Sequence, residues 1–257
     1  MLGAIIGDIA GSPYERTNLK SLAAPLFARG SQFTDDTVLT VATADVLMNG
    51  GDYTEAYQRY GRRFPNAGYG GTFRQWIVAE QPASYGSWGN GSAMRASPIG
   101  WACESIEQVL TEARCSAQVT HDHPEGIKGA QAAASAVFLA RTSHTKTEIK
   151  NYLSQTFSYD LHRTIEAIRP SYAFDVSCQG SVPEAVIAFL ESENFEHALR
   201  LAISLGGDSD TIASITGAIA HAFYREIPVH MTRMAHSLLA PDLDETIRTF
   251  CTRYAIP

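Results

Sequence analysis

Apolar residues recur at spacings of three and four positions along nearly the whole chain, which is the pattern of helices that bury one face. Alternating runs of β-branched residues, which strands would need, are absent. Helices are expected over Met1–Ala10, Thr37–Met48, Ser105–Val119, Ile127–Arg141, Asn194–Leu205, Asp210–Tyr224, Val229–Leu239 and Asp242–Tyr254. No repeat, charge block or linker divides the chain. The sequence therefore predicts one compact, orthogonal all-α domain over residues 1–257.

Glycines indicate how the first helices pack and end. Gly3, Gly7 and Gly11 fall on one face of the first expected helix, where they form a smooth strip that permits close packing. Gly50–Gly51 provide a natural end for the helix that is expected to start at Thr37.

Two pairs of residues have the capping-box spacing that marks helix starts. They are Thr145 with Glu148 and Ser181 with Glu184. The longest stretch without a regular pattern is Asn66–Gly91, which is rich in glycine and aromatic residues. A loop of this length inside a compact domain tends to be functional.

The charge balance and the cysteines limit the classes of function. The formal net charge is −7, whereas a general nucleic-acid binder needs a basic surface. The apolar stretch Leu2–Ala10 is too short to span a membrane and has no basic segment before it, so neither a membrane anchor nor a signal peptide is expected. The four cysteines form no CxxC pair, which favours reduced thiols. We therefore expect a cytoplasmic protein.

Two acidic motifs stand directly before apolar helices. They are Thr34-Asp35-Asp36-Thr37 and Gly207-Asp208-Ser209-Asp210-Thr211. Taken singly, such a motif is more often a helix cap than a metal site, because Asp, Ser and Thr are favoured at helix starts. Capping uses one side chain per helix, however, and here each start holds two carboxylates with flanking hydroxyls. Two such clusters in one chain favour metal binding.

If the two helix starts converge, their four carboxylates share one small volume. Like charges about 4 Å apart repel by roughly 4 kcal/mol per pair at intermediate dielectric. Helix dipoles offset only about 0.3–1 kcal/mol each. Bound divalent cations would offset the remaining repulsion between the carboxylates. Hard oxygen ligands suit magnesium, manganese or calcium better than zinc or copper.

A glycine-rich turn and a histidine motif are further candidates for ligand contact. In Trp88–Arg95, the small residues and the polar Asn90 and Ser92 suit a phosphate, although most such turns are only turns. Trp88 and Tyr85 have the rings to stack on adenine, but core or lid positions are the commoner fate of aromatic residues. The run Thr120–Glu125 (Thr-His-Asp-His-Pro-Glu) fits a metal site, a ribose contact or a plain polar helix entry.

Together these motifs resemble the ADP-ribosylglycohydrolase family, which includes the dinitrogenase reductase-activating glycohydrolases and the ADP-ribosylserine hydrolases of animals. The resemblance extends from Gly3–Asp8 to Gly217–Tyr224 and is strongest at Phe33–Thr37, Gly89–Arg95, Thr120-His121 and Ser204–Ala213. It implies the all-α fold of that family and two magnesium ions, with manganese as the alternative. After Pro228 no motif matches.

By motif match, the resemblance assigns roles to particular residues. The metal ligands would be Thr34, Asp35, Asp36, Asp208, Asp210 and Thr211. The diphosphate and adenosine would be held by Gly86, Ser87, Trp88 and Asn90, and His121 would lie by a ribose. Glu15 resembles a glutamate on a mobile loop in the branch that cleaves O-glycosidic ADP-ribose, which makes it a candidate gate or metal-linked base.

The expected reaction is hydrolysis of the glycosidic bond between ADP-ribose and a modified acceptor. Positive charge develops on the ribose ring in such a reaction, so nearby carboxylates would stabilise it. Asp36 or Glu15 would serve as the base, and Asp208 is expected to be essential. The acceptor stays open among arginine, serine, another side chain, a nucleic-acid base and a small ester, with Glu15 favouring O-linked substrates. A monomer would suffice for such a site.

Two other functions compete with this interpretation. A helical phosphohydrolase of the His-Asp type would use His121-Asp122 and recruit histidines such as His197, His221 or His236, but it would leave the paired aspartates without a role. The other is a non-catalytic relative, which would only bind ADP-ribose or serve as a structural protein. Structural relatives would be expected to lack metal ligands, and the matched positions are intact here.

Overall fold

The computed structural model describes all 257 residues, and its secondary structure is entirely helical apart from one isolated bridge between Gly89 and Ser177. The helices are α1 (Leu2–Gly11), α2 (Asp35–Asn49), α3 (Tyr53–Arg63), α4 (Gly71–Val78), α5 (Gly91–Met94), α6 (Ser97–Ala102), α7 (Ile106–Gln118), α8 (Pro124–Arg141), α9 (Lys146–Phe157), α10 (Ile165–Ile168), α11 (Cys178–Glu191), α12 (Phe195–Ser204), α13 (Ser209–Tyr224), α14 (Val229–Leu238) and α15 (Pro241–Arg253). A 3-10 turn, Ser12–Tyr14, follows α1. The predicted all-α fold class, one compact helical domain, is confirmed.

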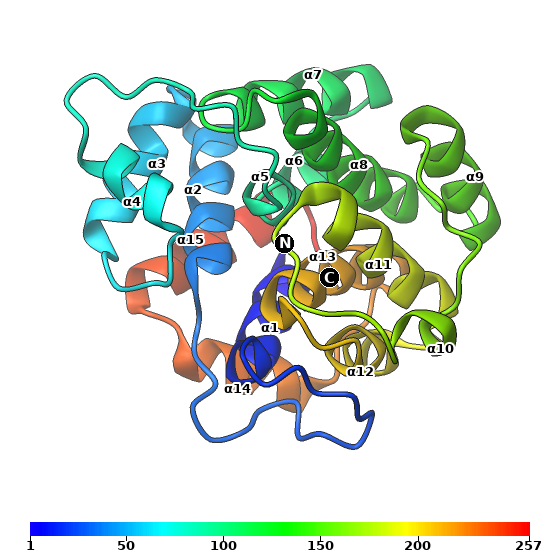
Figure 1. Ribbon diagram of the computed structural model, residues 1–257. Helices are drawn as coiled ribbons and strands as arrows, with labels where there is room; N and C mark the ends of the chain where they lie inside the picture. The colour runs from blue at the N-terminus through cyan, green and yellow to red at the C-terminus, as the bar shows by residue number, and fades with distance from the viewer.

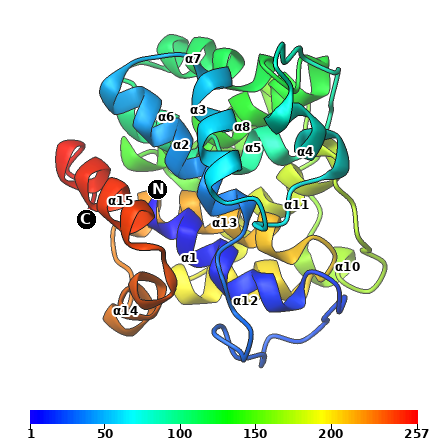
Figure 2. The ribbon, with the colours of Figure 1, turned by 90° about the vertical axis from the view of Figure 1, so that its left-hand side faces the viewer.

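Helices α1 and α13 form the centre of the molecule and make its most extensive helix–helix packing (Figure 2). All residues of α1 are buried. The predicted glycine strip is the reason that the two helices come so close. A Cβ atom on Gly7 would lie 2.0 Å from the Ala213 carbonyl oxygen, and one on Gly3 would lie 2.2 Å from the Gly217 carbonyl oxygen.

The remaining helices surround this pair (Figure 1). Helix α13 also packs against α8, α11 and α12, while α2 packs against α3 and α15. The segment between α1 and α2 runs over the surface as a long connection without α-helix. No helix is both long and apolar enough to cross a lipid bilayer.

Two helices, α2 and α8, begin two or more residues before their predicted starts. Helix α2 begins at Asp35 rather than at Thr37, because the Thr34 hydroxyl caps it by accepting from Asp36 N at 3.3 Å. Helix α8 begins at Pro124, because the His123 side chain accepts from the Glu125 N–H as its cap. The aspartates of the first motif therefore occupy the first turn of α2, where the helix dipole favours negative charge.

One of the two predicted capping boxes is present. Thr145 and Glu148 form a full capping box at α9. The prediction for Ser181 and Glu184 is wrong, since α11 begins at Cys178 and its cap, Ser177, lies four residues before Ser181. The Ser177 hydroxyl already accepts from Gly180 N at 3.1 Å, so Ser181 falls inside the helix.

The stretch expected to be a long loop, Asn66–Gly91, contains helix α4, and α3 precedes it without having been predicted. The two helices are held together by side chains of α3. Arg62 Nε donates to Ile77 O at 2.8 Å, and Gln58 Nε2 donates to Trp76 O at 3.0 Å. After α4 the chain is irregular as far as Asn90, and this part borders the cleft described below.

Candidate metal and ligand site

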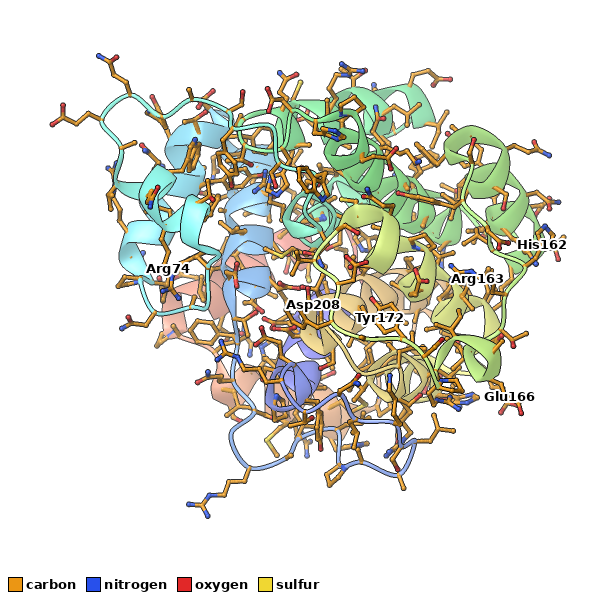
Figure 3. The ribbon with its side chains drawn as sticks, in the orientation of Figure 1. Arg74, His162, Arg163, Glu166, Tyr172 and Asp208 are labelled. Carbon is orange, nitrogen blue, oxygen red and sulfur yellow. The ribbon has the colours of Figure 1, made fainter.

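The starts of α2 and α13 meet at the floor of a cleft. Thr211 Oγ1 donates to Asp36 Oδ1 at 3.3 Å, so the two acidic motifs are in direct contact. Asp208 lies near the middle of the face seen in Figure 3, with Tyr172 beside it. The structure therefore brings together the two motifs on which the metal hypothesis depends.

The cleft has a volume of about 400 Å³ and two chemically different ends. The acidic end is lined by Glu15, Asp35, Asp36, Asp208, Asp210 and Thr211. The other end is lined by residues that include Tyr85, Ser87, Gly89, Asn90, Gly91, Arg95 and His121. Thr34 lies buried at the cap of α2, whereas Gly86 and Trp88 lie beside the lining rather than in it. Trp88 is 53% exposed and meets the ring of His123 edge-on.

Burial and mutual repulsion raise the pKa values of the cluster. Burial, together with the charge of Asp8, raises the pKa of Asp35 to about 8, although part of this side chain remains open to the cleft. For Asp36 the same two causes, and for Asp210 burial and the charge of Asp208, raise the pKa well above its usual range. Burial also raises the pKa of Asp208. The four carboxylates are therefore difficult to ionise together without a compensating positive charge.

Divalent cations fit this cluster. Carboxylate oxygens of Glu15, Asp208 and Asp210 all lie within 4.8 Å of one another, and Asp36 Oδ2 is buried without a hydrogen-bond partner. Buried carboxylates are normally paired or coordinate a metal, and oxygen-only donors suit hard cations. Burial, followed by the charge of Asp208, raises the pKa of the half-buried Glu15.

Asp8 is a structural part of the site that the motif analysis did not single out. Its carboxylate is fully buried and accepts from the backbone N–H of Thr34 at 2.9 Å, from its hydroxyl at 2.7 Å and from the N–H of Thr37 at 3.1 Å, as well as from the Thr37 hydroxyl. Burial raises its pKa to about 6, against the effect of these hydrogen bonds. Asp8 thus fixes the start of α2 to α1. The sequence does contain one indication of this role, because Asp8 is the only charged residue in an otherwise apolar helix.

Asn90 connects the glycine-rich turn to the acidic end. Its amide Nδ2 donates to Asp208 Oδ2 at 2.6 Å and to Ser181 Oγ at 3.0 Å. The side chain thereby orients Asp208 and holds the turn against α11.

The histidine motif divides into three separate roles. Asp122 accepts from Ser84 Oγ and from Gly86 N, both at 2.7 Å, and so holds the irregular segment after α4. His123 caps α8. His121 is buried and faces the cleft, where burial, with the charge of Arg95, lowers its pKa well below its usual value.

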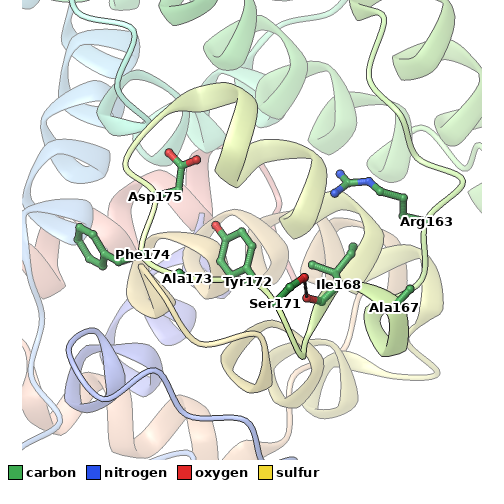
Figure 4. Close-up of a pocket in the computed structure, with 8 residues that line it drawn as sticks. All are labelled: Arg163, Ala167, Ile168, Ser171, Tyr172, Ala173, Phe174 and Asp175. Atoms are coloured by element: carbon green, nitrogen blue, oxygen red, sulfur yellow. Dashed lines mark hydrogen bonds between the residues drawn. The ribbon is translucent and has the colours of Figure 1, made fainter.

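The rim beside the acidic end is formed by the strap Ser171–Asp175. Lys20 Nζ donates to Tyr172 O at 2.6 Å, which ties the connection after α1 to this strap. Phe174, which is 54% exposed, lines the cleft and also a second hollow of about 410 Å³ that extends toward Arg163 (Figure 4).

The histidines that a His-Asp phosphohydrolase would need do not gather around His121. His197 Nδ1 accepts from Glu193 N at 3.3 Å, next to the start of α12. His221 Nε2 lies 3.1 Å from Pro257 O in the core, and His236 pairs with Asp244 on α15. None of the three lines the cleft.

An all-helical domain with a buried acidic cluster at one end of a ligand-sized cleft has the features of an enzyme whose active site is rich in carboxylates. The sequence model of the ADP-ribosylglycohydrolase family matches residues 1–255, and the chain belongs to this family. It is accordingly a hydrolase.

Similar proteins agree with this assignment. The chain is 28% identical to the ADP-ribosylhydrolase ARH3 of Mus musculus over 87% of this chain and 82% of that protein. It is also 28% identical to ARH3 of Homo sapiens, over 87% of this chain and 84% of that protein. A solved structure described as an ADP-ribosylglycohydrolase-related protein complex has the same fold, with a TM-score of 0.71, 22% identity, and coverage of 99% of this chain and 96% of that one.

Proposed function

We propose that this protein is a magnesium-dependent hydrolase that cleaves the glycosidic bond between ADP-ribose and a modified acceptor. The observation that carries the proposal is the contact between Asp36 and Thr211, which joins two acidic helix starts at the floor of one cleft. The family to which the chain belongs and its ARH3 relatives support ADP-ribose as the ligand. Manganese is the alternative cation.

Two cations would be held by Thr34, Asp35, Asp36, Asp208, Asp210 and Thr211. When bound, the cations supply positive charge that polarises water and the hydroxyls of the sugar. The protein's own contribution is orientation. Asp8 holds Thr34 at the start of α2, and Asn90 holds Asp208 through its 2.6 Å hydrogen bond.

The opposite end of the cleft would bind the ADP part of the ligand. Ser87 and Asn90 line it, and Gly86 and Trp88 lie next to it, so this end offers hydroxyl, amide, backbone and aromatic groups. Trp88 has the exposed ring that stacking on adenine requires. His121 faces the same space and would lie by a ribose.

The reacting bond would lie over the acidic end, because positive charge that develops on the ribose ring is stabilised by carboxylates. Two residues are candidates for the base that removes a proton from the attacking water. Asp36 is buried in the cluster, and Glu15 is half-buried at its rim. Burial raises the pKa of both carboxylates in the protein without cations, and the positive charge of bound cations would lower these pKa values toward the neutral range in which a base operates.

We infer that the acceptor is joined through an oxygen atom. The support is Glu15, whose segment resembles the loop of the branch that cleaves O-glycosidic ADP-ribose and whose carboxylate reaches Asp208 and Asp210 here. We further propose that the protein acts as a cytoplasmic monomer.

A panel of ADP-ribosylated acceptors tests the function directly. Arginine-, serine-, nucleic-acid- and ester-linked ADP-ribose would each be incubated with the purified protein, with magnesium or with a chelator. Release of free ADP-ribose only with the metal is the expected result. Phosphate or nucleoside products would support a phosphohydrolase instead, and binding without any release would support a non-catalytic ADP-ribose binder.

A further inference from the structure

Arg95 is a buried cation without a carboxylate partner. Its side chain is fully buried, and the guanidinium lies 4.1 Å from the centre of the Tyr57 ring. Its Nη2 donates to Ser116 O at 2.8 Å and to Thr120 Oγ1 at 2.9 Å. Burying a charge without an ion pair is costly, so the contacts that Arg95 makes need a reason.

The contact with Thr120 extends to the cleft. Thr120 Oγ1 is also 2.7 Å from His121 Nδ1, and Thr120 is fully buried. Arginine only donates hydrogen bonds, so the threonine oxygen accepts from Arg95. The threonine's own proton then has one acceptor within reach, which is His121 Nδ1. If Nδ1 carried the proton instead, the Thr120 hydroxyl proton would be buried without a partner, which costs free energy.

The hydrogen bond to Nδ1 also determines whether the other ring nitrogen of His121, Nε2, carries a proton. With Nδ1 accepting, the neutral ring carries its proton on Nε2. Burial and the charge of Arg95 keep the ring neutral by lowering its pKa. A Cβ atom on Gly91 would lie 3.2 Å from Nε2, and one on Gly89 would lie 3.5 Å away, so Nε2 faces the glycine-rich turn of the cleft.

We propose that Arg95 and Thr120 are positioning residues that lock His121 in the Nε2–H tautomer, so that it donates one hydrogen bond to an acceptor oxygen of the bound ligand. A protonated Nε2 has no lone pair, so His121 is neither a metal ligand nor a general base through that atom. The tautomer follows from this chain's own hydrogen bonds, and only the identity of the ligand as ADP-ribose rests on the proposed function.

Nitrogen NMR of the ¹⁵N-histidine-labelled protein tests the tautomer without any reaction. The chain has 8 histidines, and the resonances of His121 are identified by their loss in His121→Asn. We expect the Nε2–H pattern in the wild type, unchanged between about pH 6 and 8 because the pKa is lowered. We expect Thr120→Val to remove the hydrogen bond to Nδ1, which moves the Nδ1 resonance toward that of a lone pair without a donor, and Thr120→Ser to restore the wild-type resonance.

Thr216→Val is the matched control, because Thr216 is equally buried, donates to Ala185 O at 2.9 Å and lies outside the cleft lining. It should leave the His121 tautomer unchanged. A proton on Nδ1 or a charged ring in the wild type would overturn the proposal. So would a Thr120→Val protein whose Nδ1 resonance is the same as in the wild type.

Ligand binding gives a second readout. Calorimetry with free ADP-ribose should show about 2- to 12-fold weaker binding to Thr120→Val, the range for one neutral hydrogen bond, with recovery in Thr120→Ser. Equal affinity of wild type and Thr120→Val would overturn the donor role. If the wild type bound no ADP-ribose while its NMR pattern was as expected, the proposed function would fail and the tautomer assignment would stand.

Discussion

Thr211 donates a hydrogen bond of 3.3 Å to Asp36, although the two residues are 175 positions apart in the sequence. The bond joins the first turn of α13 to the first turn of α2. The carboxylates of both turns therefore act on one another. Burial, followed by the charges of Asp8 on α1, Asp35 and Asp208, raises the pKa of Asp36. A change at either helix start is expected to alter cation binding by the whole cluster.

Replacing Asp208 with Asn should abolish turnover while the fold is retained. The amide keeps the size of the side chain but removes one negative charge from the cluster. We expect kcat to fall by more than the roughly 10- to 100-fold typical of residues that only support metal ligands. Release of free ADP-ribose under saturating magnesium measures the loss, and circular dichroism reports the fold.

The matched control for this variant is Asp52→Asn. Asp52 caps α3 by accepting from Thr54 N at 2.7 Å, and asparagine caps helices equally well. Near wild-type activity of Asp208→Asn in saturating magnesium, or an equal loss in Asp52→Asn, would contradict the assignment.

Without cations, the protein should lose stability as the pH rises from about 6.5 to 8. Asp35 has a pKa raised to about 8 when folded, so the folded state binds its proton more tightly than the unfolded chain does. Its contribution to stability is complete below the unfolded pKa and is lost as the pH rises through the folded value. His121 and His221, whose pKa values are lowered, act in the opposite direction only below about pH 6.5. The Met1 amino group, whose pKa burial lowers to about 5, opposes the effect up to about pH 8. Asp36 and Asp210, whose pKa values are raised well above their usual range, act in the same direction as Asp35 and outweigh the amino group.

Thermal unfolding in a chelator, and again in magnesium, measures this dependence. We expect the midpoint in the chelator to fall across the window and the gain from magnesium to grow, because protons and cations compete for the same carboxylates. Asp35→Asn should flatten the slope in the chelator. A chelated protein whose midpoint rises with pH over this window would be inconsistent with the raised pKa.

The parts of the site that could be predicted from the sequence are those formed by residues close together in the chain. The carboxylates at the starts of α2 and α13 stand in short motifs, because a helix start needs neighbouring residues of particular types. Even α3, which was not predicted, has a local signal. Asp52 precedes it as a cap, and Tyr53, Ala56, Tyr57 and Tyr60 are buried at helical spacing.

The features of the fold and the site that were not predicted depend on contacts between segments that are far apart in the sequence. The hydrogen bonds of Asp8 to the start of α2 cross 26 and 29 positions, and that of Lys20 to the strap at Tyr172 crosses 152. Such pairings follow from how the helices pack and leave no pattern in the neighbouring residues. For the same reason, the burial of Arg95 beneath the cleft was not evident from the motif that contains it.

Replacing Trp88 with Ala should weaken ADP-ribose binding more than it affects the chemical step. Its ring is half exposed beside the cleft, so the cost to folding should be small. Base–aromatic stacking contributes about 1–3 kcal/mol, which corresponds to roughly 5- to 150-fold in Kd. Calorimetry gives Kd for the variant, with Val78→Ala as a control because Val78 is 68% exposed and lies outside the cleft. Equal affinities of Trp88→Ala and Val78→Ala would exclude the stacking role.

Glu15→Gln distinguishes the two candidate bases. Glu15 lies at the rim of the cluster, whereas Asp36 is buried within it, so the glutamine variant should keep much more of its magnesium affinity than Asp36→Asn. If Glu15 receives the proton, kcat should fall by about 100-fold or more with little change in KM. Kinetics and magnesium titration of both variants measure the difference. Unchanged kcat in Glu15→Gln would leave Asp36 as the base, and Glu166→Gln controls for loss of a distant surface carboxylate.

Gly7→Ala should destabilise the protein by more than the about 1–3 kcal/mol usual for overpacking a core. The added Cβ would lie 2.0 Å from Ala213 O and 2.8 Å from Ser214 N, and both are backbone atoms of α13 that cannot rotate away. Helices α1 and α13 would have to separate, which would also displace Asp8 and with it the start of α2. We therefore expect a lower unfolding midpoint and, in whatever protein remains folded, weaker magnesium binding.

Gly71→Ala is the matched control, since a Cβ there meets nothing within 4 Å and alanine favours the α4 helix. A Gly7→Ala protein as stable as Gly71→Ala would show that α1 and α13 are not in close contact, and the acidic cluster would then lose the support that places it at the floor of the cleft.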